Sequence, residues 1–202
     1  MHEPYVVYGM AASGNCYKIK MALERLGLPY RWHEVDVVGG ETKGAAFKAL
    51  NPNGKVPVLQ LPDGQLLAES NAILWYLAQD STLWPAERLA QAEVMQWLFF
   101  EQYSHEPYIA TVRFWVKFAG KANEMADEIA KRRVQGYRAL DVMERRLTDR
   151  AYLAGEHCTI ADLALYAYTH VAEEGGFTLG DYPAIGAWMK RVAAAPQHVQ
   201  MG

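Results

Sequence analysis

The sequence contains few cysteines: only Cys16 and Cys158 occur in 202 residues. Two thiols are too few for a disulfide scaffold or for a zinc site built from cysteine. The six histidines also form no pair at the spacing of metal ligands, so they do not supply a zinc site either. We therefore expect reduced thiols, no metal and a cytoplasmic protein.

The sequence also lacks an excess of either charge and lacks long hydrophobic runs. Its 20 Lys and Arg stand against 23 Asp and Glu, and the formal net charge is -3. This balance, with no basic run, argues against nucleic acid or an anionic membrane as partner. The chain begins with Met-His-Glu-Pro-Tyr, which is not a secretory signal, and no apolar run is long enough to span a bilayer.

The first 80 residues alternate strand patterns with helical patterns. Strands are predicted over residues 5–8, 30–37, 58–61 and 65–68, and helices over residues 13–26, 42–50 and 70–79. The helix between the first two strands makes them parallel with a right-handed crossover, and the turn Asp63-Gly64 makes the last two an antiparallel hairpin. The strand after Pro57 is expected to pair with one neighbour. Residues 1–80 are therefore predicted to form an α/β domain with a small mixed sheet.

No strand pattern follows a linker near residues 80–86. Helices are predicted over residues 88–118, 123–148, 159–174 and 183–194, and Pro107 is expected to kink or break the first. Thr159 and Asp162 have the N-cap and N3 spacing of a capping box. Residues 86–202 are predicted to form an all-helical second domain.

The stretch "YGMAASGNCYKIKMALERLGLPY" gathers Ser13, Gly14, Asn15 and Cys16 at the start of the first helix. A helix N-terminus stabilises an anion, and Gly14 permits close backbone approach. The turn also follows a strand directly, and open sheets bind ligands at the carboxyl ends of their strands. Ser13 could instead be a plain helix cap, so both interpretations stay open.

Two later segments carry similar features. In "NPNGKVPVLQL", a cis bond before Pro57 would leave the N–H and C=O of Val56 free to pair with an extended peptide, whereas a trans bond would be ordinary at a strand start. In "LLAESNAILWYL", Glu69 and Ser70 open the third helix, either as a second anion site beside a carboxylate or as common first-turn residues. Together these features suit a short peptide with an amine, two carboxylates and a thiol.

The segments "NPNGKVPVL", "ESNAILWYL" and "LAGEHCTIADLALY" resemble, in this order, those of the cytosolic glutathione S-transferases. The resemblance covers essentially the whole chain, and "SGNCYKIKMAL" is similar to the active-site segment of bacterial serine-type, theta- or zeta-like members. It implies a thioredoxin-like N-terminal domain of order βαβαββα and an all-helical C-terminal domain. It also implies glutathione as co-substrate, a small hydrophobic electrophile, a role in detoxification and a homodimer.

The resemblance also implies roles for individual residues. Ser13 matches the serine that hydrogen-bonds the glutathione sulfur, and Asn15, where some relatives carry cysteine, would share that role. The backbone of Val56 would pair with the cysteinyl unit beside the cis-proline Pro57. The remaining glutathione contacts would be Glu69 and Ser70 at the γ-glutamyl end, Lys43 near the glycine carboxylate, and Lys55.

This family chemistry is thiol activation. A glutathione thiol has an ordinary pKa of about 8.5, and Ser13 with the helix N-terminus would favour the thiolate, which is the nucleophile. Cys16 completes a C-x-x-C spacing whose first cysteine is replaced by Ser13, which argues against a dithiol oxidoreductase. Two roles for Cys16 stay open: a mixed disulfide with glutathione, or a small buried apolar residue.

The stretch "WLFFEQYSHEPYIATVRFWVKF" is dense in aromatic residues, most of which we expect in the core or in a dimer interface. A more polar stripe runs through it at helical spacing. The resemblance implies that the first long helix of the second domain faces the active cleft, so this stripe would contact the electrophile; a solvated face is the alternative. The predicted contacts are Tyr103, Glu106 and Arg113.

Other functions fit the same segments. A glutathione-dependent isomerase, dehalogenase or disulfide reductase would keep the glutathione site and change the chemistry. A non-catalytic interaction module of the same fold is a further alternative. The joint presence of Ser13, Pro57, Glu69 and Ser70 argues against a module, because a chain freed from catalysis need not keep them together.

Overall fold

The computed structural model describes residues 3–202, which divide into two compact units. The sheet unit contains the residues up to Ser81 together with Pro196–Gly202, and the helical unit contains Thr82–Ala195. No helix within residues 3–202 combines the length and apolarity needed to cross a membrane.

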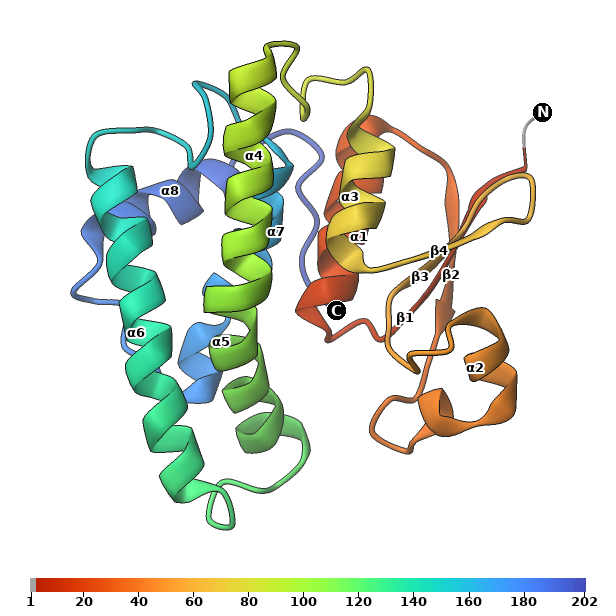
Figure 1. Ribbon diagram of the computed structural model, residues 1–202, viewed down its shortest axis with the longest axis horizontal. Coiled ribbons are helices and arrows are strands. Elements are labelled where there is room, and N and C mark those ends of the chain that lie inside the picture. Colours follow the sequence, from red (N-terminus) through yellow and green to blue (C-terminus); the bar gives the residue numbers. More distant parts are fainter. Residues whose placement is uncertain (1–2) are drawn as a thin grey trace. The chain divides into compact units, whose positions relative to one another are not determined.

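The sheet unit has the predicted order of strands and helices (Figure 1). Its elements are β1 (Tyr5–Gly9), α1 (Gly14–Leu26), β2 (Tyr30–Glu34), α2 (Ala45–Leu50), β3 (Val58–Gln60), β4 (Leu66–Ala68) and α3 (Ser70–Ala78). The sheet order is β2-β1-β3-β4, with β1 parallel to β2 and the hairpin β3–β4 antiparallel, as predicted. The expectation that the strand after Pro57 has one neighbour is wrong, because β3 also pairs with β1. The thioredoxin-like fold of this unit is confirmed.

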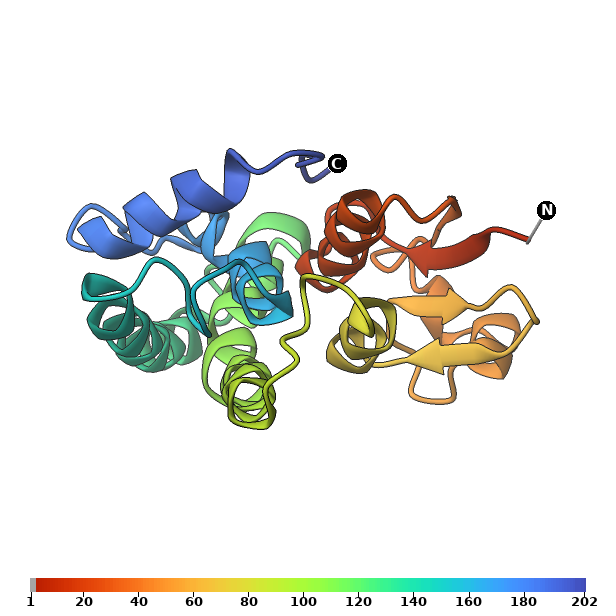
Figure 2. The ribbon, with the colours of Figure 1, turned by 90° about the horizontal axis from the view of Figure 1, so that it is seen from above.

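Alternation along the strands assigns residues to the two faces of the sheet. Gly9 faces α1 so closely that an added Cβ would lie 3.0 Å from the Cys16 sulfur. Tyr8 points to the opposite face, where Phe47 of α2 packs with Val58 in a hydrophobic cluster. Figures 1 and 2 show α1 and α3 side by side on one face of the sheet and α2 on the other. The N-termini of α1 and α3, at which the sequence predicts a binding site, therefore belong to helices of one layer.

The C-terminal segment Pro196–Gly202 packs on the sheet unit, which no pattern in the sequence predicts. The buried Tyr17 donates its hydroxyl to the carbonyl oxygen of Val199 at 2.6 Å. Lys20 donates to the carbonyl oxygen of Gln200 at 3.4 Å. The segment is therefore attached to α1 through its own backbone carbonyls.

The helical unit confirms the second domain as all-helical in its described structure. Its α-helices are α4 (Arg88–Phe100), α5 (Glu106–Arg113), α6 (Ala126–Thr148), α7 (Ile160–Thr169) and α8 (Pro183–Ala193). The helix predicted over residues 88–118 is interrupted by two π-helical turns, Glu101–His105 and Phe114–Phe118. Pro107 lies in the first turn of α5, directly after the first π turn, as expected for a residue that cannot donate a backbone hydrogen bond.

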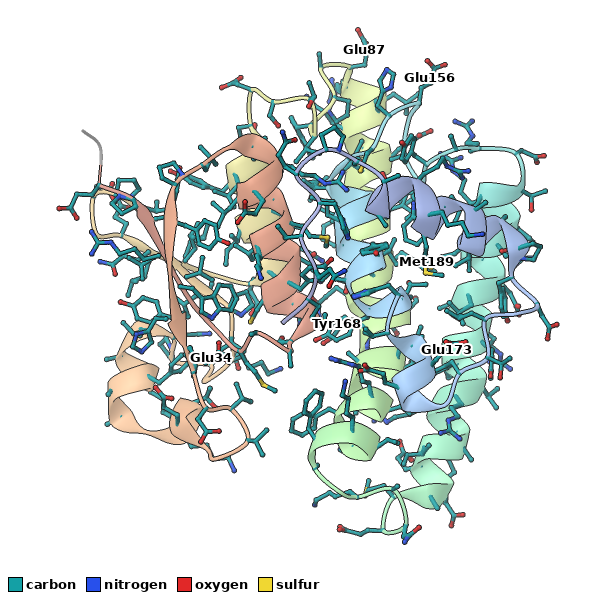
Figure 3. The ribbon with its side chains drawn as sticks, turned by 180° about the vertical axis from the view of Figure 1, so that it is seen from behind. Glu34, Glu87, Glu156, Tyr168, Glu173 and Met189 are labelled. Carbon is teal, nitrogen blue, oxygen red and sulfur yellow. The ribbon has the colours of Figure 1, made fainter. Side chains whose placement is uncertain are left out.

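The capping box predicted at Thr159 and Asp162 is present at the start of α7. Thr159 accepts a hydrogen bond from the Ala161 N–H at 3.3 Å, and the Asp162 carboxylate accepts one from the Thr159 N–H at 2.8 Å. Asp162 also accepts from the Leu153 N–H at 3.0 Å and the Trp188 indole at 2.9 Å. All residues of α7 are buried, so this box anchors the central helix of the unit, on which Figure 3 labels Tyr168.

Candidate functional site

Ser13 occupies the N-cap position of α1, but its side chain does not cap the helix. Its backbone is extended, its carbonyl accepts from the Tyr17 N–H at 2.8 Å, and its side chain makes no capping hydrogen bond. The hydroxyl instead hydrogen-bonds the Cys16 thiol. The plain-cap interpretation is therefore wrong. No acidic side chain lies in the first turn of α1, so no carboxylate of that turn neutralises the partial positive charge of the helix N-terminus.

The loop that presents Ser13 is held by Glu34, a residue that the sequence did not single out. Both carboxylate oxygens of Glu34 accept from the Ala11 N–H, at 2.9 and 3.2 Å, and the Trp32 indole donates to the same carboxylate at 2.6 Å. Figure 3 labels Glu34 at the carboxyl end of β2. The Ser13 N–H also donates to the Met10 carbonyl at 2.9 Å. These bonds fix the turn between β1 and α1.

Cys16 lies fully buried between α1 and the sheet. Burial raises the pKa of its thiol from 9.0 to about 12, although hydrogen bonds from Ser13 and the Met10 backbone act in the opposite direction. The thiolate, which is the reactive form, is therefore almost absent at neutral pH. The structure favours Cys16 as a small buried residue over Cys16 as a redox group, and neither Cys16 nor Cys158 forms a disulfide within residues 3–202.

The segment before β3 presents a free peptide edge. The Val56–Pro57 bond is cis, and no hydrogen bond within residues 3–202 engages the backbone N–H or C=O of Val56. Asn51 holds the preceding turn by donating to the Lys55 carbonyl at 2.7 Å. The Lys55 side chain is exposed.

Lys43 belongs to a turn that lies near the free backbone edge at Val56, because the backbone of its neighbour Thr42 comes close to Gly54. It is exposed in a short 3-10 turn, Glu41–Lys43. Gly54 has φ +64, and an added Cβ there would lie 2.9 Å from the Thr42 carbonyl oxygen. Only glycine fits this contact easily, so the turn beside Lys43 and the turn beside Lys55 meet.

The N-cap of α3 lies one residue earlier than predicted, at Glu69 and not at Ser70. Glu69 is the N-cap residue, with the unusual φ of 69°, and Ser70 is the first helical residue, so the prediction that Ser70 caps the helix is wrong. A positive φ at a residue other than glycine is costly and is found mainly at functional sites. The Ser70 hydroxyl donates to the Asn15 side-chain oxygen at 3.2 Å. The structure therefore brings the Ser13–Asn15 turn and the Glu69–Ser70 turn together.

The electrophile contacts predicted in the helical unit occupy different environments. Tyr103 is 82% exposed in the first π turn, whereas Arg113 is 3% exposed and pairs with Glu174 at 2.6 Å. Lys117 pairs with the same carboxylate at 2.6 Å. Partial burial acts to raise the pKa of Glu174, but the two cations outweigh it and lower that pKa. Glu106 is half-buried. The assignment of these residues to the electrophile stays a prediction.

No group of three or more His, Cys, Asp or Glu side chains within residues 3–202 is arranged to hold a metal ion. The polar groups that gather in the sheet unit are hydroxyl, amide, ammonium and free backbone groups. Such groups recognise carboxylates, amines and peptide bonds.

Comparison with known proteins matches both parts of the chain to family models. Residues 12–80 match the glutathione S-transferase N-terminal domain, and residues 93–196 match the glutathione S-transferase C-terminal domain. A crystal structure of a glutathione S-transferase from Pseudomonas fluorescens is 57% identical, with a TM-score of 0.96 over 98% of this chain and 99% of that one.

Two further relatives bear on the chemistry. A structure of Ure2p in complex with glutathione is 25% identical, with a TM-score of 0.88 over 98% of this chain and 92% of that one. The disulfide-bond oxidoreductase YfcG of Escherichia coli is 30% identical over 92% of this chain and 89% of its own length.

Proposed function

Because the chain belongs to the glutathione S-transferase family, we propose that it is an enzyme that activates the glutathione thiol for attack on small hydrophobic electrophiles. The observation that carries this proposal is the meeting of two helix N-termini, joined by the Ser70–Asn15 hydrogen bond at 3.2 Å. Each helix end favours an anion. Glutathione supplies one anion at its γ-glutamyl carboxylate and another at its sulfur.

In the proposed binding mode, glutathione lies extended along the sheet unit. Its cysteinyl backbone pairs with the free N–H and C=O of Val56, and its γ-glutamyl end lies at the start of α3, where Glu69 receives the ammonium group. The glycine carboxylate lies near Lys43 and Lys55, whose turns meet through Gly54. This direction places the sulfur near Ser13 and Asn15.

The proposed chemistry needs no proton transfer to the protein, because the glutathione thiol loses its proton to solvent water as the bound thiolate forms. Ser13 turns its hydroxyl from Cys16 to the glutathione sulfur and donates one hydrogen bond to the thiolate. The thiolate then forms a bond to the electrophilic carbon, whose leaving group departs. Each unit by which the site lowers the thiol pKa corresponds to about 1.4 kcal/mol and raises the thiolate fraction nearly tenfold below saturation. The electrophile is proposed to contact Tyr103, Glu106 and Arg113, and the subtype is proposed to be serine-type, theta- or zeta-like.

The test is a pH titration of bound glutathione, followed by its thiolate absorbance. We expect the thiol pKa to fall by at least about one unit on binding to the wild type, and the Ser13→Ala variant to lose most of that shift. Ser81→Ala is the matched control, since Ser81 donates its hydroxyl to the Ala78 carbonyl at the end of α3. Retention of the full shift in Ser13→Ala, with loss in Asn15→Ala, would transfer the role to Asn15.

The similarity to YfcG favours disulfide reduction as a second candidate function. One glutathione thiolate would attack a disulfide substrate to give a mixed disulfide and a free thiol, and a second glutathione would release the other thiol as oxidised glutathione forms. The high pKa of Cys16 argues that this thiol is not the nucleophile. Turnover of 2-hydroxyethyl disulfide, retained in Cys16→Ala, without turnover of 1-chloro-2,4-dinitrobenzene would favour the reductase. Chlorinated and isomerisable substrates test the dehalogenase and isomerase alternatives, and failure to bind glutathione would favour an interaction module.

We also propose that the protein acts as a cytoplasmic homodimer. Leu89 and Phe99 leave 76% and 66% of their surface exposed along α4. The helical repeat places them on one face. Exposed apolar groups gathered on one face are typical of an interface, and a second copy of the chain is the partner that the family implies.

A further inference from the structure

Glu34 ends β2 and lies on the face of the sheet that carries α1 (Figure 3). In the parallel register of the two strands it stands opposite Gly9, which faces α1. Trp32 shares this face, because side chains alternate along a strand. An added Cβ on Gly9 would lie 3.1 Å from the Trp32 ring, so the ring packs directly against the glycine. The Trp32 indole donates to the Glu34 carboxylate at 2.6 Å and thereby fixes the position of an exposed side chain.

The Glu34 carboxylate holds a turn whose own hydrogen bond leaves one N–H outside it. The Ser13 N–H donates to the Met10 carbonyl at 2.9 Å, so Ala11 is the second residue of a four-residue β-turn. The N–H of the second residue takes no part in the hydrogen bond that closes such a turn. Glu34 accepts this N–H with both oxygens, at 2.9 and 3.2 Å. These bonds tie the turn to β2, and Ser13 is the residue with which the turn ends.

The negative charge of Glu34 acts against a thiolate at the start of α1. Burial is the main cause of the raised pKa of Cys16, and the charge of Glu34 adds to it. A negative charge opposes the ionisation of any thiol near it, and this includes a glutathione sulfur placed at the same helix end. A favourable effect of Glu34 on thiolate formation therefore has to come from the hydrogen bonds that hold the turn.

We propose that Glu34 is a positioning residue for thiol activation: its hydrogen bonds to the Ala11 N–H hold the turn that aims the Ser13 hydroxyl at the glutathione sulfur. The inference rests on the proposed function, in which that hydroxyl donates to the thiolate. Hydrogen bonds weaken steeply as their distance and angle depart from the optimum, so a small displacement of the turn removes this donor. Glu34 acts through Ser13 and makes no contact with the sulfur.

Two variants separate the reach of this side chain from its charge. Glu34→Gln removes the charge and keeps the reach. One oxygen is enough for both donors, because Oε2 already lies 3.2 Å from the Ala11 nitrogen and 2.6 Å from the Trp32 indole nitrogen. Glu34→Asp keeps the charge but draws the oxygens back by about 1.5 Å, the length of one C–C bond. This takes them out of hydrogen-bond distance of both donors.

The measurement is the thiol pKa of bound glutathione, titrated by thiolate absorbance on the full-length protein. In Glu34→Asp we expect this pKa to lie about one unit above that of the wild type, so that the thiolate fraction at about pH 6.5 falls about tenfold. Glu34→Gln should give a thiol pKa no higher than that of the wild type. Glutathione affinity, measured by calorimetry at about pH 6.5, where little thiolate is present, should change less than about threefold in both variants.

Glu24→Asp is the matched control on the same unit. Glu24 accepts from the Tyr30 hydroxyl at 2.8 Å and is shortened in the same way, but it lies in α1 at the end remote from Ser13. This variant should change the thiol pKa of bound glutathione by less than about a third of a unit.

The inference requires a rise of the thiol pKa in Glu34→Asp without a rise in Glu34→Gln, and any other pattern overturns it. A change confined to Glu34→Gln would indicate an effect of charge alone. A loss of glutathione affinity as large as the loss of thiolate would indicate a merely structural role. In each of these cases the wild type still lowers the thiol pKa, so the proposed function stands. A wild type that does not lower it, or does not bind glutathione, would overturn both.

Discussion

At the scale of single residues, burial decides what each of the two cysteines can do. Cys16 is fully buried with a pKa raised to about 12, whereas Cys158 is partly exposed. At pH 8 a thiol with that pKa is ionised to about one part in ten thousand. We therefore expect one fast thiol per native chain towards a disulfide reagent such as 5,5'-dithiobis(2-nitrobenzoic acid), and two after unfolding.

The Cys158→Ser variant makes this prediction specific. It should leave no fast thiol in the native protein, and the slow reaction of Cys16 should accelerate as the pH rises towards 12, because the thiolate fraction rises with pH below the pKa. Rapid reaction of Cys16 at pH 8 in that variant would contradict the buried, protonated thiol and would reopen the mixed-disulfide role.

Residue types indicated which groups lie at the two helix starts, but they did not indicate the hydrogen bonds that these groups make. The sequence indicated which hydroxyl, amide and backbone groups gather at the two helix starts. It did not show that Ser70 is the first helical residue, that Lys18 lies beneath it, or that Glu34 holds the Ala11 N–H. These contacts join residues distant in the chain, and a lysine or glutamate in a polar pattern reads equally well as a solvated side chain.

At the scale of single elements, the sequence predicted where helices occur, but it did not predict which of their side chains share a face. The stripe from Tyr103 to Arg113 assumed the repeat of 3.6 residues throughout. The π turn at residues 101–105 has a wider repeat, so Tyr103 becomes exposed while Arg113 becomes buried. Only Pro107 signalled a departure from regular helix, and it could not specify a π turn.

The capping box of α7 could be predicted because its signal is local, and it gives a prediction about stability. Asp162 accepts from the Leu153 and Thr159 N–H groups and from the Trp188 indole. Asp162→Asn replaces one acceptor oxygen with a donor that faces these donors. We expect a loss of about 2–4 kcal/mol in the free energy of unfolding, measured in urea at neutral pH.

Asp127→Asn is the matched control, since Asp127 lies exposed in the first turn of α6 and should cost less than about 1 kcal/mol. Burial raises the pKa of Asp162 against the effect of its donors. A group whose pKa is raised in the folded state binds its proton more tightly there, so lowering the pH through that pKa stabilises the wild type relative to Asp162→Asn, and the difference should widen. An equal cost for both variants would contradict the anchoring role.

At the scale of the whole molecule, the sequence predicted the change from mixed sheet to helices near residue 80, and the chain divides at Ser81 and Thr82. It did not predict that Pro196–Gly202 returns to the sheet unit. The reason is physical: Tyr17 and Lys20 bind backbone carbonyls of Val199 and Gln200, and every residue carries such a group. Because the C-terminal segment contributes only backbone groups to these contacts, its side-chain pattern gives no sign of them.

The exposed apolar face of α4 gives the prediction for the whole molecule. A charge placed on this face would have to be buried in a dimer and would stay in water in a monomer. We expect the wild type to sediment as a dimer at micromolar concentration and Phe99→Glu to sediment as a monomer with unchanged circular dichroism. Phe99 is 66% exposed in the described chain, so the substitution disturbs little packing within it.

Val134→Glu is the matched control, because Val134 is 53% exposed on α6, outside the α4 face. It should remain dimeric. A wild type that sediments as a monomer would contradict the interface, and so would a Phe99→Glu variant that stays dimeric. If Phe99→Glu becomes monomeric and still lowers the pKa of bound glutathione, the thiol-activating groups are complete within one chain. Loss of that shift together with the dimer would mean that a second copy supports the site.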